Sequence, residues 1–458
     1  MKSIYIYIQV ICIGYLFISC KREWLDAKPN KALVVPTTIK DYQAILDNNT
    51  GTDMFNWNSP SLSEIGAGDF YISYPSYQGL YLAQERNSYV WASDIYQGET
   101  GYDWQNAYNR VLYSNIVLNG IKNIVRDTSN QSSWDNIKGS ALFYRSYDFY
   151  SLAQEFCKPY YSVSASTDLG IPLRNTSDIN VKSVRSSVQQ TYDQILNDLL
   201  YSAKLLPIAS TSPTRPSRNA AFGLLARTYL TMENYDKAYL YADSCLQTSN
   251  GLLNYNSLDT ITTTPITRFN KEIIYYHLLA SYESMDVSTP ILNVDSTLYN
   301  SYDANDLRKR ILLTNFNGIN TYKGTYFNDY AFFGGLATDE MYLIRSECNA
   351  RKGNTNIAMN DLNTLLLSRW MTGRFIPYTA TSADDALRQI LIERRKELVF
   401  RGTRWTDLRR LNRDTRFAVT LTRILNGQNY SLSPNDPRYI YPIPPEEIRL
   451  SGIEQNIR

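Results

Sequence analysis

The segment 383–412 constrains the fold most strongly, because it places arginine and glutamate among apolar residues on one helical face. Apolar and arginine side chains recur there at helical spacing, at Leu387, Ile390, Leu391, Arg394, Leu398 and Arg401. Glu393 and Glu397 stand four residues apart between them. The apolar face continues beyond Gly402 with Trp405, Leu408 and Leu411. A solvated helix keeps its charges on one side, and an unpaired buried charge is very costly. The pattern therefore predicts a paired, partly buried network of Arg and Glu between helices.

The stretch ERRKELVFRGTRWTDLRR in this segment resembles the C-terminal signature of the SusD/RagB family of outer-membrane nutrient-binding lipoproteins. The matching positions are Glu393, Arg394, Glu397, Leu398, Gly402, Arg404, Trp405, Asp407, Leu408 and Arg409. These residues are either ligand contacts or parts of a buried network that joins helices. We favour the buried network, because fold signatures usually concern packing.

The N-terminus predicts a secreted, lipid-anchored protein. Lys2 precedes an apolar run over residues 4–19, which is too short for a comfortable membrane span and is typical of a signal peptide. Its end, LFISC, resembles a bacterial lipobox with Cys20 as the lipidated residue. We expect residues 1–19 to be removed and residues 20–458 to form a single SusD/RagB-like domain. An ordinary cleavage site and an uncleaved anchor are the alternatives.

Helical patterns account for most of the remaining chain. Three long helices are predicted over residues 103–125, capped by Asp103, and over 134–156 and 186–206. A tetratricopeptide-like spacing follows at Phe222, Leu225, Ala226, Tyr229 and Ala238, and a weaker unit spans residues 340–367 with Gly353 in its turn. The resemblance implies the same fold class: mainly α, with a scaffold of tetratricopeptide-like helix pairs and an irregular, loop-rich lobe that carries the binding face.

Two regions without helical periodicity, residues 48–100 and 250–338, are the predicted lobe. They are rich in Asn, Gly and aromatic residues, and the whole chain holds 38 Tyr. Long irregular stretches in a compact protein usually carry function. A buried strand is predicted over residues 273–279 within the second region.

The candidate ligand contacts are aromatic residues with polar neighbours in these two regions. Flat rings match the faces of a sugar, and amide, carboxylate or cationic groups match its hydroxyl edge. The candidates are Trp91, Tyr96, Asp94 and Gln97, then Tyr71, Tyr74 and Tyr77 in a predicted turn, and Tyr322, Lys323 and Tyr326 in the second region. Trp104 is left out, because it falls on the apolar face of the following helix. The alternative for each aromatic residue is packing within its own loop.

Several kinds of chemistry lack their residues. His277 is the one histidine and lies in the predicted apolar strand, so no multi-histidine metal site is possible. Nucleotide-binding glycine loops are absent from the sequence, and residues 303–306 lack the glycine and glutamate of an EF-hand. We expect no cofactor and no metal. The net charge of +2 gives no general attraction to nucleic acid.

The resemblance implies a non-enzymatic, cell-surface protein anchored in the outer membrane. Such a protein would bind a glycan or similar oligomeric nutrient and deliver it to a TonB-dependent, SusC-like transporter. A secreted helical glycoside hydrolase and a repeat scaffold that binds only protein are the two alternatives. One sequence does not exclude a catalytic carboxylate pair, because Asp and Glu are plentiful.

Overall fold

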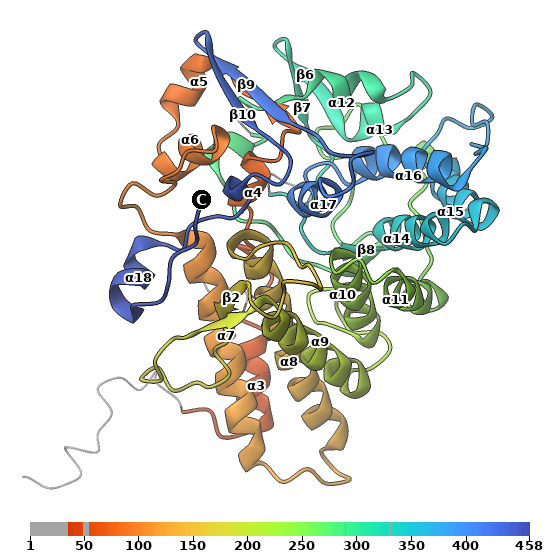
Figure 1. The fold of residues 1–458 in the computed structure, drawn as a ribbon. Helices are drawn as coiled ribbons and strands as arrows, with labels where there is room; N and C mark the ends of the chain where they lie inside the picture. Colours follow the sequence, from red (N-terminus) through yellow and green to blue (C-terminus); the bar gives the residue numbers. More distant parts are fainter. Residues whose placement is uncertain (1–34, 49–54, 289, 329–330) are drawn as a thin grey trace, which may run out of the picture.

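The structure is a computed structural model that describes residues 35–48, 55–288, 290–328 and 331–458 (Figure 1). Helices dominate it, and the strands are short and antiparallel. This architecture confirms the predicted mainly α fold. The signal peptide and Cys20 lie outside the described residues, so their roles stay predictions.

The scaffold is a row of helices that pack on one another from the bottom of Figure 1 to its right side. In order these are α7 (Tyr102–Gly120), α8 (Gln131–Phe156), α9 (Val188–Leu205), α10 (Arg218–Thr231), α11 (Tyr235–Thr248), α14 (Thr338–Arg351), α15 (Thr355–Leu367) and α16 (Ala383–Glu397). Each contacts its neighbour as far as α14, which contacts both α15 and α16, and α3 (Ile39–Leu46) packs against α7 and α8. The row is the tetratricopeptide-like scaffold that the sequence predicted.

The two tetratricopeptide-like pairs lie side by side although residues 249–337 separate them in sequence. α11 contacts α14 directly, so the intervening chain leaves the helix row and returns to it. Ala238, Ala242 and Ala358 are fully buried at these helices, where small side chains allow close approach. Gly353 turns the chain between α14 and α15 with a φ of 84°, which favours glycine.

Local side chains define where the helices begin. Thr38 and Ser187 form capping boxes at α3 and α9, as their positions before each apolar run indicate. Asp103 behaves differently from the prediction, because it lies inside α7 and does not cap that helix. Its buried carboxylate accepts the backbone N–H groups of Ser61 and Leu62, both at 2.7 Å. It therefore caps α4 (Leu62–Ile65), a short helix of the lobe.

The two predicted irregular regions interlock to form the lobe at the top of Figure 1. β1 (Phe70–Tyr71) of the first region pairs with β5 (Asn293–Val294) of the second, and β4 (Ile273–Tyr275) pairs with β8 (Leu336–Ala337). The predicted strand over 273–279 is therefore shorter, and it continues as single bridges from Leu278 and Leu279. The other elements of these regions are α5 (Tyr74–Gly79), α6 (Ala83–Tyr89), η2 (Tyr255–Ser257), η3 (Glu283–Met285), α12 (Ser296–Ser301), α13 (Arg308–Ile311), β6 (Leu313–Phe316) and β7 (Ile319–Tyr322).

The remaining elements are short. They are η1 (Ile121–Asn123), β2 (Leu169–Pro172), β3 (Arg185–Ser187), α17 (Arg404–Leu411), β9 (Leu421–Leu425), β10 (Gln428–Leu432), η4 (Pro437–Tyr439) and α18 (Pro445–Ser451). β9 and β10 form a hairpin that stands beside α5 in Figure 1.

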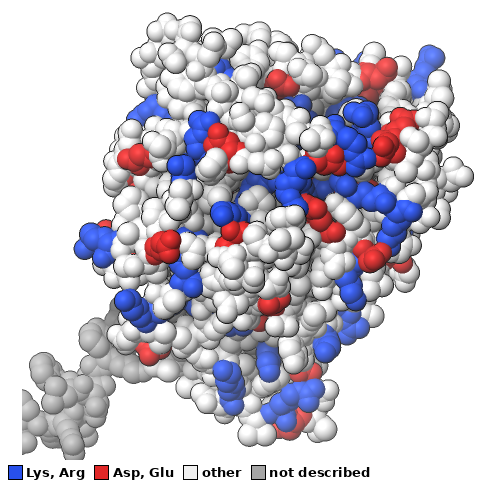
Figure 2. Space-filling view, viewed as in Figure 1, with Lys and Arg blue, Asp and Glu red and all other residues white. Residues whose placement is uncertain are grey.

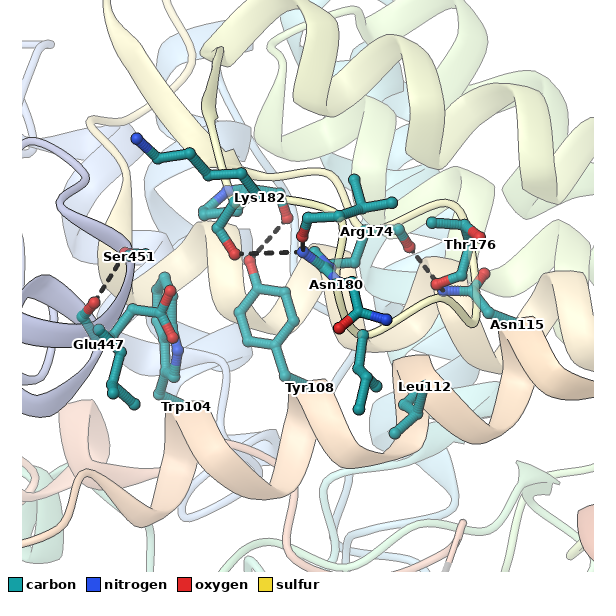
Figure 3. Close-up of a pocket in the computed structure, with 15 residues that line it drawn as sticks. Trp104, Tyr108, Leu112, Asn115, Arg174, Thr176, Asn180, Lys182, Glu447 and Ser451 are labelled. Atoms are coloured by element: carbon teal, nitrogen blue, oxygen red, sulfur yellow. Dashed lines mark hydrogen bonds between the residues drawn. The ribbon is translucent and has the colours of Figure 1, made fainter.

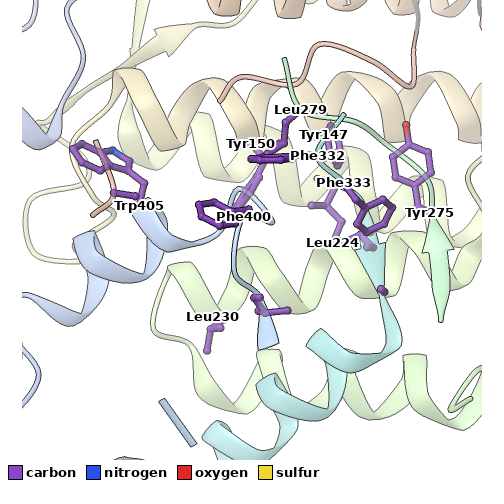
Figure 4. Packing of buried hydrophobic residues seen from close by; sticks show 14 of the residues in the cluster. Tyr147, Tyr150, Leu224, Leu230, Tyr275, Leu279, Phe332, Phe333, Phe400 and Trp405 are labelled. Carbon is purple, nitrogen blue, oxygen red and sulfur yellow. The ribbon is translucent and has the colours of Figure 1, made fainter. Parts of the chain in front are cut away.

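Aromatic side chains fill the core where the lobe meets the scaffold. Figure 4 shows Tyr147 and Tyr150 of α8, Leu224 of α10 and Tyr275 of β4 gathered with residues from the lobe. His277 stacks on Tyr147 with ring centroids 4.6 Å apart, and burial holds its pKa well below the usual value. It is a neutral core residue, which supports the interpretation of the sequence.

The signature segment contributes buried ion pairs to this core. Arg308 of α13 is fully buried and contacts Glu393 at 2.5 Å and Glu397 at 3.0 Å. Glu397 also pairs with Arg369 at 2.7 Å. Arg394 pairs with Asp407 at 2.7 Å. These contacts support the packing interpretation, because each buried charge has an opposite charge beside it.

Two other signature residues, Arg404 and Trp405, do not take part in these ion pairs. Arg404 lies 3.6 Å from Asp69 and does not contact Glu397. Trp405 is 1% exposed and packs against Tyr439 with ring centroids 4.7 Å apart. The signature segment therefore contributes both to the buried ion pairs and to the neighbouring aromatic packing around Trp405.

Candidate functional site

The structure places Trp91 and Tyr96 in the core, so the prediction that their rings face the surface is wrong. Trp91 is 2% exposed and donates its indole N–H to the Gly66 carbonyl oxygen at 3.0 Å. Its backbone adopts a left-handed φ of 55° just after α6, which turns the ring toward the buried Arg423 guanidinium. Tyr96 is 1% exposed, and burial raises its pKa well above the usual value. Both rings therefore contribute to the packing of the lobe.

The candidates from the second region are also buried, and the prediction of an exposed contact site there is wrong. Lys323 donates from Nζ to the carbonyl oxygen of Thr260 at 2.7 Å, and burial lowers its pKa. The Tyr326 hydroxyl donates to the Glu272 carboxylate. Tyr322 is 3% exposed and donates to a carbonyl oxygen two residues further on. Each polar tip holds a loop of the lobe in place.

The remaining predicted residues are at least partly exposed: Tyr71, Tyr74, Tyr77, Asp94 and Gln97. Tyr71 is 46% exposed at the end of β1. Tyr74 and Tyr77 are half-buried on α5, with stacked rings whose centroids are 6.4 Å apart. The predicted turn is thus a short helix, which Ser73 caps and which has Pro75 in its first turn. As ligand contacts these five residues stay predictions.

Tyr81 is the most exposed tyrosine ring of this segment, and the sequence analysis missed it. It is 86% exposed in the extended chain between α5 and α6. Leu80 before it is buried and Leu82 after it packs against the core. The sequence Leu-Tyr-Leu over residues 80–82 carries no alternation of apolar and polar residues, so no local pattern predicted that the ring of Tyr81 lies outside.

A hollow of about 280 Å³ lies near the backbone of Tyr81, which contacts one of its lining residues. The Glu283 carboxylate, which lines it, accepts the backbone N–H of Tyr81 at 3.0 Å. Beneath it, the buried Glu85 carboxylate accepts two hydrogen bonds from Ser284, while burial raises the pKa of this acid. The hollow is lined by Ala280, Ser281, Tyr282, Glu283, Met285, Asp286, Ser288 and Phe332. We call residues 71–81 together with this hollow the tyrosine segment.

The tyrosine segment combines exposed rings with exposed polar side chains. Tyr81 and Tyr71 offer ring faces, while Ser281, Glu283 and Ser288 expose hydroxyl and carboxylate groups. Rings of this kind contact the C–H faces of a sugar, and the polar groups can hydrogen-bond its hydroxyls. The arrangement fits a neutral, hydroxyl-rich ligand that is held at a shallow surface.

A second concave surface, of about 530 Å³, runs along α7 (Figure 3). Trp104, Tyr108 and Leu112 lie along one side of the helix and face the strap formed by residues 174–183. Trp104 is 5% exposed, and the Tyr108 hydroxyl donates to a backbone carbonyl at 2.8 Å. Arg174 donates to two carbonyl oxygens within the strap itself. The Tyr108 hydroxyl and the Arg174 guanidinium therefore hold the strap and the chain just before it, and we do not place the ligand there.

Two family models match the chain. One, described as starch-binding associating with outer membrane, matches residues 23–230, and the other, described as the SusD family, matches residues 338–457. The chain is also 24% identical over 446 residues to SusD-like protein P2 of Formosa agariphila, covering 81% of this chain and 83% of that protein.

Solved structures share the fold. A putative sugar binding protein from Bacteroides vulgatus superposes with a TM-score of 0.71 at 20% identity, covering 92% of this chain and 99% of that one. A SusD superfamily protein from Bacteroides thetaiotaomicron gives a TM-score of 0.71 at 20% identity, with coverage of 92% and 100%. A SusD-like carbohydrate binding protein from Bacteroides vulgatus gives 0.69 at 22% identity, with coverage of 91% and 97%. Within the described part of the chain, no helix has the length and apolarity that a membrane span requires.

Proposed function

This chain belongs to the SusD/RagB family, and from that premise we propose that it binds a glycan at the outer membrane and passes it to a SusC-like, TonB-dependent transporter. The two family models support the class of ligand and the membrane association. The observation that carries the proposal is the exposed ring of Tyr81, on a segment whose backbone contacts Glu283 at the edge of a polar hollow. The neighbouring Tyr71, Tyr74 and Tyr77 extend the contact along the ligand.

We further propose that the ligand is held without being cleaved. Within the described part of the chain, the carboxyl groups of Asp103 and Glu155 share a hydrogen bond, and these residues are buried at 2% and 1% exposure. Asp103 accepts two backbone N–H groups, and Glu155 accepts the N–H of Ser63 at 3.0 Å. A glycosidase needs two carboxyl groups that reach the scissile bond, and this pair instead fixes the lobe to the scaffold.

The test is a panel of glycans incubated with the purified protein, in which both retention and product release are measured. We expect retention of at least one glycan with no shorter product. Product release would support the hydrolase alternative, and neither retention nor release would support a scaffold that binds only protein. A transporter recovered with the detergent-solubilised protein would support the proposed partnership.

The anchor is tested separately. Cys20→Ala removes the proposed lipidation site, so we expect the variant to lack acyl label and to leave the membrane fraction, because stable anchoring requires the attached lipid. Unchanged acyl labelling and membrane retention would contradict the lipoprotein proposal.

A further inference from the structure

A hollow of about 940 Å³ lies at the lower end of the molecule in Figure 1, where α3, the beginning of α8 and the end of α9 meet. The chain that leads from α9 into α10 forms its remaining wall. Lys40, Gln131, Ser132, Lys204 and Thr211 line it and are exposed, so their polar groups can be reached from solvent. The described residues that line it differ from those of the α7 groove and of the tyrosine segment. It is therefore a separate and open site, which the proposed function does not explain.

Positive charge dominates the lining of this hollow. Its described residues include four cations: Lys40, Lys204, Arg215 and Arg218. Asp135 is the one lining carboxylate among the described residues, and it accepts hydrogen bonds from Nε and Nη2 of Arg126, both at 2.8 Å. Arg215 donates from Nε to the Asp47 carboxylate at 2.8 Å. Asp135 and Arg215 are thus already paired, and we call this site the basic hollow.

The other three lining cations, Lys40, Lys204 and Arg218, have no carboxylate partner among the described residues. They belong to α3, α9 and α10, so three separate helices bring them to one hollow. Asp41, the neighbour of Lys40, caps α3 by accepting the backbone N–H of Thr38 at 2.9 Å. Among the described residues no side chain caps α8, whose first residues, 131–133, line the hollow, so the positive end of this helix adds to the same charge. The basic hollow therefore favours an anion.

Exposed aliphatic side chains lie close to the basic hollow. Ile208 is 56% exposed between the lining residues Pro207 and Ala209. Val125 is 81% exposed, and its carbonyl oxygen accepts a hydrogen bond from the side-chain amide of Asn130, just before α8. A soluble anion gains little from such side chains, whereas a bilayer presents phosphate groups directly above its acyl chains. Cations with neighbouring aliphatic residues therefore favour a lipid surface over a free anion.

The position of the basic hollow in the chain also favours a membrane. α3, which forms one wall, is the first described helix after Cys20, the proposed site of lipidation. The sequence of residues 21–34 between them has four basic residues and two acidic ones, so it carries the same sign of charge as the hollow. Lys and Arg side chains are also spread over the lower end of the molecular face in Figure 2. Basic segments beside a membrane anchor are attracted to anionic lipids.

We infer that the basic hollow is the face of the protein that lies against an anionic lipid surface. Lys40, Lys204 and Arg218 hold a lipid phosphate group, while Val125 and Ile208 enter the interface between headgroups and acyl chains. This contact orients the protein body on the membrane and is separate from the acyl chain on Cys20. The inference goes beyond the proposed function, because it involves no residue of the tyrosine segment.

Co-sedimentation with lipid vesicles tests the inference on the full chain carrying Cys20→Ala, so that no acyl chain at this position holds the protein to the vesicle. Vesicles of phosphatidylcholine with phosphatidylglycerol are compared with vesicles of phosphatidylcholine alone, which measure any contribution of the apolar residues 4–19. We expect roughly tenfold or more tighter binding to the anionic vesicles, and we expect this preference to fall as salt screens the charges. Equal binding to the two vesicle types would overturn the inference. Binding of heparin, a soluble polyanion, without a preference for anionic vesicles would overturn it as well.

Lys40→Gln combined with Lys204→Gln removes two exposed charges from the hollow. We expect affinity for the anionic vesicles to fall roughly tenfold or more, while the melting temperature hardly changes, because neither lysine forms an ion pair with a described residue. Lys237→Gln combined with Lys271→Gln is the matched control, since it removes the same charge from exposed positions that do not line the hollow. Equal losses of affinity in the two double variants would indicate attraction by net charge alone and would overturn the inference.

Ile208→Ser distinguishes a lipid surface from a soluble polyanion. The substitution keeps every charge of the hollow, so we expect it to weaken binding to the anionic vesicles several-fold and to leave any heparin binding unchanged. An Ile208→Ser variant that binds the anionic vesicles as tightly as its parent would contradict the placement of this face in the lipid interface.

Discussion

The ion-pair network around α16 and the lobe segment that carries the tyrosines are held in place by buried arginines in different ways. In the network, Arg308 and Arg369 are fully buried, and each contacts carboxylates such as that of Glu397. Against the lobe, the buried Arg423 of β9 has no carboxylate partner among the described residues and donates to the carbonyl oxygens of Tyr89, Phe70 and Ile65 at 2.6–2.9 Å. The network thus holds helices together through ion pairs, whereas Arg423 holds loops together by donating hydrogen bonds to their backbone carbonyl groups.

This difference indicates which positions tolerate substitution. A buried charge tolerates few substitutions, because removing one partner leaves the other unpaired. Exposed rings such as Tyr81 contribute little to packing, so the lobe can present them to a ligand without loss of stability. Structure and recognition are therefore carried by different residues of neighbouring segments.

The largest expected effect is on the network. Glu397→Ala leaves Arg308 and Arg369 without one of their carboxylates, and we expect the free energy of unfolding to fall by about 3–5 kcal/mol. Denaturant unfolding measures it. Glu446→Ala is the control, because Glu446 is 64% exposed in its pair with Arg449 and should leave stability unchanged. A Glu397→Ala variant as stable as the wild type would contradict the account of the network.

The next effect depends on pH and concerns the junction between the two regions. Glu64 is 1% exposed, and burial raises its pKa from 4.5 to about 8. The stability that protonation of this group contributes is fully present below pH 4.5 and is lost as the pH rises through 8. The free energy of unfolding should therefore fall with pH across this window, by about 1.4 kcal/mol per unit from this group.

Glu64→Gln isolates that contribution, because glutamine keeps the shape of the protonated acid and does not ionise. We expect the variant to match the wild type near pH 5 and to exceed its stability by about 2–4 kcal/mol near pH 8. Melting temperatures at the two pH values measure the difference. An equal pH dependence in both proteins would show that Glu64 is ionised in the folded state.

A smaller effect is expected for a buried ring of the lobe. Trp91→Phe removes the indole hydrogen bond to Gly66, and we expect a loss of about 1–3 kcal/mol. Ligand affinity of the folded variant should be unchanged, since the ring is 2% exposed. Thermal unfolding and glycan titration of the same preparation measure both quantities, and a loss of affinity at full stability would return Trp91 to the binding site.

The sequence predicted the scaffold and the buried network better than it predicted the candidate site. Interleaved charges such as Glu393 and Arg394 can be buried at low energetic cost only when they are paired, so their pattern predicts buried ion pairs. An aromatic ring is stable either in a core or at a surface. Trp91 and Tyr81 both lie just outside α6, yet Trp91, with a left-handed φ of 55°, is buried, and Tyr81 is exposed.

Contacts between residues far apart in the chain could not be predicted from local sequence patterns either. Asp103 was expected to cap its own helix, but its carboxylate caps a helix that begins 41 residues earlier in the chain, as the bonds from Ser61 and Leu62 show. The contact of α11 with α14 across residues 249–337 is another example. Local patterns define each element, whereas these contacts depend on how the whole lobe closes over the scaffold.

The most direct test of the central claim, that exposed rings bind and buried groups hold the fold, is a titration of Tyr81→Ala with a glycan that the panel identifies. We predict that affinity falls on the order of tenfold, about 1.4 kcal/mol, because a few aromatic residues dominate such contacts. The melting temperature should stay at the wild-type value. Undiminished affinity in Tyr81→Ala, and also in Tyr71→Ala, would contradict the account and place the ligand on another surface.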